Sequence, residues 1–149
     1  MAMVVLFVAT SVVFLVLDAI MLTQVMAPLF ERHIGPLMAE PFRLGPAVGF
    51  YLAYVAGLMW LVTWPALRSG GPVPGRAVVL GLMCYGTFEF TSWAVMRDWH
   101  WTMVAIDTLW GGVLTGVSGW AGVAITRRLV RAWRGAGSGC IRPAPKRIF

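Results

Sequence analysis

Three carboxyl groups lie inside long apolar stretches of the sequence, where an acid is costly. They belong to Asp18, Glu89 and Asp107. A carboxylate at the centre of a lipid bilayer costs a few kcal/mol or more, so such acids commonly bind a proton, a cation or the polar head of a ligand. The alternative is structural: protonated carboxyls hydrogen-bond neighbouring helices and contribute about 0.6 kcal/mol per pair. Both interpretations stay open.

The three acids are expected at similar depths in the membrane. Each lies six or ten residues from a Pro or Trp at the end of its apolar stretch, which is about 9–15 Å along a helix. No Lys or Arg lies in the interior of these stretches, so the acids must be protonated, hydrogen-bonded or neutralised by a bound cation. Including hydroxyls expected at a similar depth, the candidate ligand- or ion-binding residues are Asp18, Glu89, Asp107, Tyr51, Tyr54 and Thr91.

The sequence contains no recognisable catalytic or metal-ligating pattern. His33 and His100 are isolated, and Cys84 and Cys140 are too remote from each other to pair. No Ser or Cys stands beside a His within one helix or loop. We therefore expect no catalytic residue, no metal and no cofactor.

The elements that carry the acids are four apolar segments. Of the 149 residues, 59% are hydrophobic and 12% charged, where a soluble domain has about 25% charge, and the mean hydropathy is +0.78. These values exclude a soluble enzyme, a disordered chain and a disulfide scaffold. Runs of about 20 apolar residues predict membrane-spanning helices at 3–26, 46–67, 76–96 and 101–126, and hence an all-α, four-helix bundle. We expect the first to end at Ala27-Pro28 and to be retained as a membrane helix.

The basic residues predict the orientation of the bundle. Seven of the twelve follow Thr126: Arg127, Arg128, Arg131, Arg134, Arg142, Lys146 and Arg147. Because Lys and Arg concentrate on the cytoplasmic side, the tail 127–149 is expected in the cytoplasm, and four spans place the N-terminus there too. This distribution argues against nucleic-acid binding. Arg127, Arg128, Arg131 and Arg134 are expected to contact anionic lipid headgroups or a partner, and Trp99 and Trp101 to lie at the opposite interface.

The fourth segment is rich in glycine. Gly111, Gly112, Gly116 and Gly119 are spaced so that helix backbones could approach closely. Two interpretations stay open, packing within the bundle and contact with a helix of another membrane protein.

Four short motifs resemble a known family. They are residues 17–22 (LDAIML), 50–57 (FYLAYVAG), 85–92 (YGTFEFTS) and 107–111 (DTLWG). Together they resemble the bacterial four-helix membrane family catalogued as domain of unknown function 2177, over about residues 3–125. The resemblance implies a four-helix inner-membrane protein and names no reaction.

The chain departs from the family pattern at two motifs. The family has Asp-x-x-Trp where this chain has Met21, and Tyr-Asp-Leu-Thr-Asn at the positions from Phe88 to Ser92. A site that requires fixed geometry would tolerate such changes badly. Either the layer formed by Asp18, Glu89 and Asp107, here called the acidic layer, is structural, or this member has diverged from the family's role.

Three functions are consistent with these features. The first is a non-enzymatic accessory subunit that docks in a larger inner-membrane complex, such as a respiratory or photosynthetic one, as a multi-pass protein with membrane lipids and other membrane proteins as partners. The second is a binder or transporter of a proton, a cation or an amphipathic ligand through the acidic layer. The third is a membrane enzyme that modifies lipids with the acids as general acid and base.

Overall fold

The computed structural model describes residues 1–39, 41 and 43–138, and all regular structure in this part of the chain is helical. Four helical segments are long and apolar enough to cross a membrane, which confirms the predicted fold class. The first segment contains α1 (Ala2–Met21), a π turn (Leu22–Met26), α2 (Ala27–Ile34) and a 3-10 turn (Gly35–Leu37). The second contains α3 (Leu44–Leu58), a π turn (Met59–Thr63) and α4 (Trp64–Ser69). The third and fourth are α5 (Pro74–Val95) and α6 (Trp101–Ser138).

The first segment does not end at Ala27-Pro28 as expected but stays helical to Leu37. A proline inside a helix lacks an N–H group, and its ring clashes with the carbonyl four residues back. Here a π turn precedes the proline, and the N–H of Ala27 bonds the carbonyl of Leu22, five residues back. The same device precedes Pro65, where the N–H of Trp64 bonds the carbonyl of Met59. The wider turn admits each proline without breaking the helix.

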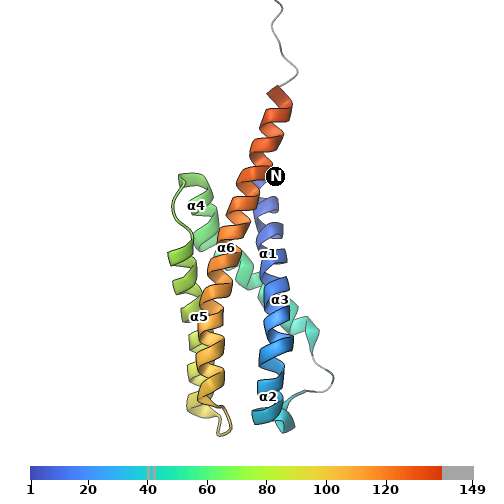
Figure 1. Cartoon of the computed structure of the whole chain (residues 1–149), viewed down its shortest axis with the longest axis vertical. Coiled ribbons are helices and arrows are strands. Elements are labelled where there is room, and N and C mark those ends of the chain that lie inside the picture. Colours follow the sequence, from blue (N-terminus) through green and yellow to red (C-terminus); the bar gives the residue numbers. More distant parts are fainter. Residues whose placement is uncertain (40, 42, 139–149) are drawn as a thin grey trace, which may run out of the picture.

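The two ends of the bundle differ (Figure 1). The N-terminus and α4 lie at one end, where the C-terminal part of α6 projects beyond the other helices. We call this the α4 end. At the opposite end, the α2 end, α2 lies beside the loop between α5 and α6. The helix of α6 continues past the expected span limit at residue 126 to Ser138; the rest of the predicted tail, 139–149, lies outside the described residues.

The bundle exposes many apolar side chains and buries several polar ones among its apolar core. On α1, Val4, Val8, Val12, Val16 and Ile20 form an exposed stripe at four-residue spacing. The buried polar side chains come from all four segments and are Thr10, Ser11, Asp18, Thr63, Glu89, Thr115, Ser118 and Thr126. A protein in water would lose stability from such an arrangement, whereas lipid solvates the exposed stripe.

Three layers of buried side chains follow each other along the bundle. The α4-end layer is built around Leu58, Val62 and Ala77. The middle layer contains Phe14, Val55 and Leu114, and the α2-end layer contains Trp99, Met103 and Val104. Helix α6 packs on α1, α5 and α4, whereas α3 packs on α1 and makes at most sparse backbone contact with α5 and α6. The part of α3 from Ala47 to Tyr54 therefore leaves room inside the bundle.

Glycines allow α5 and α6 to lie almost backbone to backbone. A Cβ atom at Gly81 would overlap the carbonyl oxygen of Gly111 and lie 2.6 Å from Thr115 Oγ1. At Gly111 it would overlap the ring of Tyr85, at Gly112 it would lie 2.9 Å from Leu82, and at Gly116 it would lie 2.7 Å from Val78. At Gly119 the contacts are 3.2 Å to Thr63 and to Val73. All four glycines singled out in the sequence thus contact helices of the same chain.

We expect Gly81→Ala to lower the free energy of unfolding by about 1–3 kcal/mol, because the added methyl group forces two backbones apart. Gly57→Ala is the matched control, since Gly57 is also helical and a Cβ there meets nothing within 4 Å. Reversible unfolding in mixed detergent micelles, followed by helical circular dichroism, measures both. Equal stability of the two variants would contradict the close α5–α6 contact.

Candidate functional site

A cavity of about 380 Å³ lies between the middle and α2-end layers. Its wall contains residues of all four helical segments; six of the thirteen lining residues are Met, Leu or Phe, and three are Tyr. The polar groups in the wall are those of Asp18, Asp107, Tyr51, Tyr54, Tyr85 and Cys84. A volume of this size is within the range of small-ligand pockets, about 300–1,000 Å³.

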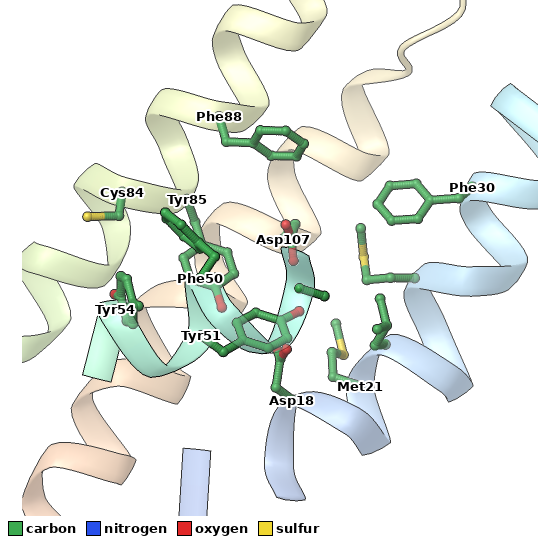
Figure 2. A pocket seen from close by; sticks show the side chains of 13 residues that line it. Asp18, Met21, Phe30, Phe50, Tyr51, Tyr54, Cys84, Tyr85, Phe88 and Asp107 are labelled. Atoms are coloured by element: carbon green, nitrogen blue, oxygen red, sulfur yellow. The ribbon is translucent and has the colours of Figure 1, made fainter. Parts of the chain in front are cut away.

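Two of the three intramembrane acids line this cavity. Asp18 comes from α1 and Asp107 from α6, and their carboxyl groups point towards the space beside the Tyr51 ring (Figure 2). The Asp18 carboxyl interacts with the Tyr51 phenol. Asp18 is 6% exposed. The polar part of the cavity is thus a pair of acids with a phenol between them.

Glu89 does not line the cavity. Its side chain is 0% exposed. One carboxyl oxygen, Oε2, accepts a hydrogen bond of 2.8 Å from the indole Nε1 of Trp99, and the carboxyl also interacts with that of Asp107. The other oxygen, Oε1, has no hydrogen-bond donor among the described residues. Of the three acids, Asp18 and Asp107 thus line the cavity, and Glu89 lies outside it as a neighbour of Asp107.

Aromatic side chains close the cavity towards the middle layer. Phe14 packs on Tyr51 and on Tyr54, with ring centroids 5.9 and 5.3 Å apart, and Tyr54 meets Tyr85 edge to face at 6.2 Å. Tyr54 and Thr115 share a hydrogen bond of 2.8 Å. The rings of Tyr51 and Tyr54 on α3 are thus held by contacts with residues of α1, α5 and α6.

Thr91 is the one candidate binding residue that lies apart from the others. Its side chain is exposed on the surface of α5, and its hydroxyl donates to the carbonyl of Thr87, 2.5 Å away. Sequence depth alone could not distinguish this face of α5 from the face that carries Glu89.

Trp99 is the main site residue that the sequence did not indicate. It was expected at the membrane interface with Trp101, and Trp101 is indeed 58% exposed, but Trp99 is only 6% exposed and bonds Glu89. The turn after α5 folds back, with the Trp99 N–H 3.5 Å from the Met96 carbonyl. Two tryptophans at 99 and 101 give no sequence signal of which one turns inward.

His33 and His100 are also brought together, although they are isolated in the sequence. Their rings stack with centroids 4.6 Å apart and an interplanar angle of 8°. His100 Nδ1 is 2.8 Å from the hydroxyl of Thr102. Within the described residues no group of three or more His, Cys, Asp or Glu side chains is placed to hold a metal ion.

The arginines after the fourth span have different surroundings. Arg127 donates a hydrogen bond of 2.9 Å to the carbonyl of Ala66 in α4, so it connects α6 to the second segment. Arg128 and Arg131 are exposed. The side chain of Arg134 lies outside the described part of the chain, and the predicted lipid contact of all four stays a prediction.

Comparison with known proteins adds the family. Residues 3–124 match the family described as predicted membrane protein (DUF2177). The chain belongs to this family. Neither a curated protein nor a solved structure matches it. This DUF2177 member is therefore a multi-pass membrane protein with four candidate spans, and any activity must be argued from its cavity.

Proposed function

We propose that the protein binds, within the membrane, a single-chain amphiphile with a positively charged ammonium head. The observation that carries this proposal is the pair of carboxyls, Asp18 and Asp107, facing into a cavity whose other lining residues are apolar or aromatic. No Lys or Arg lines this cavity to neutralise these acids. A ligand with a cationic head would supply the missing charge inside a medium where an unpaired carboxylate is costly.

Aromatic rings around the acids support an ammonium head in particular. Tyr51, Tyr54, Tyr85, Phe50 and Phe88 all line the cavity. Aromatic faces attract ammonium groups by about 0.5–2 kcal/mol each, more where water is excluded. A cage of rings with two carboxyls therefore favours an alkylammonium over an alkali ion, which needs several oxygen ligands.

The route of entry supports an amphiphile. Phe50 on α3 and Phe88 on α5 are 67% and 54% exposed although both line the cavity, and Cys84 is exposed as well. Because α3 packs mainly on α1, a ligand could enter from the lipid between α3 and α5. Its chain would then lie along the Met and Phe side chains of the wall.

We also propose that the α4 end faces the cytoplasm of a bacterial inner membrane. Arg68, Arg76, Arg127, Arg128 and Arg131 all belong to this end, with no acid nearby in sequence, whereas the α2 end carries Glu31 with Arg32 and Arg97 with Asp98. Basic residues favour the cytoplasmic side of a membrane.

A second candidate role, as a non-enzymatic accessory subunit of a larger membrane complex, rests on a different surface. A shallow apolar groove runs along α5 and α6 and is lined by Pro74, Val78, Val113, Gly116, Val117 and Trp120. Small residues beside an exposed tryptophan suit a transmembrane helix of a partner protein.

The binding proposal predicts that purified protein in nanodiscs binds dodecylammonium and discriminates against dodecanol, which has the same chain without the charge. Asp107→Asn and Asp18→Asn are each expected to weaken dodecylammonium binding about tenfold or more, because a desolvated charge pair is lost. Glu31→Gln is the matched control, an acid-to-amide change at an exposed position. Equal affinity for the amine and the alcohol in the unmodified protein would refute the proposal.

The orientation predicts the accessibility of single cysteines. In a chain carrying Cys84→Ser and Cys140→Ser, Arg97→Cys should react with a membrane-impermeant maleimide on spheroplasts, and Arg128→Cys should react only after permeabilisation. The reverse pattern would show that the bundle is inserted the other way.

The accessory role predicts that the chain migrates with other membrane proteins after purification from native membranes in mild detergent. Val117→Phe would fill the groove and should release the chain from them. Val79→Phe, the same change at a position of α5 that is 60% exposed and does not line the groove, should not. Recovery of only the free 16.3 kDa chain in detergent would argue against this role.

A further inference from the structure

Trp99 lies behind the wall of the cavity and packs on two of the aromatic side chains that form it. Its ring centroid is 5.7 Å from that of Phe30 on α2, at an interplanar angle of 41°. It is also 5.7 Å from that of Phe88 on α5, where the two rings meet edge to face at 87°. Both phenylalanines line the cavity, whereas Trp99 does not. One buried side chain thus supports the wall from the first and from the third helical segment.

The direction of the Trp99 ring is set by one hydrogen bond. The ring is 6% exposed and is surrounded by the apolar side chains of the α2-end layer, so its N–H group needs an acceptor inside the protein. Glu89 provides this acceptor, because Trp99 Nε1 donates to Oε2 over 2.8 Å. A carboxyl oxygen can accept such a bond whether or not the group carries a proton. The Glu89 side chain therefore orients the ring that supports the wall.

The two supported rings lie where the apolar part of a ligand would pack. In Figure 2, Phe88 and Phe30 lie on the other side of Asp107 from Tyr51 and Asp18. A ligand head between the carboxyls would leave its chain against these two rings. Phe88 is 54% exposed and comes from the side where α3 makes at most sparse backbone contact with α5. The position of its ring therefore depends on the buried side chain behind it.

We propose that Trp99 is a positioning residue for this wall and that Glu89 acts through Trp99, so that the pair sets the surface on which the apolar chain of the ligand packs. The ligand itself, an amphiphile with an ammonium head, rests on the proposed function. In this role Glu89 orients a ring and does not pair with the ligand head. Asp18 and Asp107 differ from it, because they face the cavity.

Fluorine NMR of the ligand-free protein tests the wall without any ligand. In protein labelled with 4-fluorophenylalanine, the resonances of Phe88 and Phe30 are assigned by changing each residue to Leu. Both resonances should shift in Trp99→Leu, because the ring current of the indole is lost. They should also shift in Glu89→Leu, because the indole loses its acceptor and turns. Glu89→Gln keeps a carbonyl oxygen for the N–H group and should leave both resonances in place.

Trp93→Leu is the matched control for the NMR experiment. Trp93 is also on α5 and also packs on a phenylalanine, Phe90, with centroids 6.4 Å apart, but it is 49% exposed and does not support the cavity. This change should leave the Phe88 and Phe30 resonances in place. If Trp99→Leu does not fold, the comparison of Glu89→Leu with Glu89→Gln decides. Identical resonances of Phe88 and Phe30 in these two variants would overturn the proposal.

Binding in nanodiscs separates a positioning acid from one that pairs with the ammonium head. Glu89→Leu should weaken the binding of dodecylammonium and of dodecanol by the same factor, roughly three- to tenfold, because both ligands have the chain that packs on the wall. Glu89→Gln should restore both affinities, and Trp93→Leu should change neither. A loss confined to the amine would show that Glu89 acts on the charge and would overturn its positioning role. If the unmodified protein binds the amine no better than the alcohol, the proposed function fails, while the fluorine spectra still decide whether Glu89 and Trp99 hold the wall.

Discussion

Lipid offers no hydrogen bonds, so each polar group of this chain must find its partner inside the protein. The hydroxyls of Thr115 and Thr126 donate hydrogen bonds of 2.6 and 2.7 Å to backbone carbonyl oxygens one turn earlier in α6. The hydroxyl of the exposed Thr91 makes the same kind of bond in α5. A carboxylate cannot be satisfied in this way, because it needs hydrogen-bond donors. The backbone N–H groups of a helix are already bonded to carbonyls of the same helix. The acids therefore lie among tryptophan and tyrosine side chains, which have N–H and O–H groups: Trp99 donates to Glu89, and Tyr51 lies beside Asp18.

The cavity exists because the helices are packed unequally. Glycines bring α5 and α6 so close that a methyl group at Gly81 would overlap the backbone of Gly111, and α1 packs along α6. On α3, by contrast, Gly45, Gly49 and Gly57 have nothing within 4 Å of where a Cβ would lie. The closely packed helices α1 and α6 carry Asp18 and Asp107, while α3, which makes sparse backbone contact with α5 and α6, supplies Tyr51 and Tyr54.

The sequence was sufficient for the fold because lipid imposes a strong pattern on composition. A run of about 20 apolar residues between charges has few structural alternatives, and the four predicted helices are confirmed. Counting residues from the helix ends also placed Asp18, Tyr51, Tyr54 and Asp107 near one another. It could not show which way side chains turn around a helix that is apolar on all faces. For this reason Thr91 was grouped with the acids although it faces outwards, and Trp99 was expected at the interface although it bonds Glu89.

The π turn between α1 and α2 affects more than the proline that follows it. Phe30 is twelve residues after Asp18, and at about 100° per residue a regular helix would rotate it about 120° away from the acid. One additional residue in the turn removes about 100° of this rotation, so both side chains line the same cavity. The π turn thus changes which face of the first segment points into the bundle after Met26. The part of the helix that carries Asp18 and the part that carries Phe30 then line the same cavity.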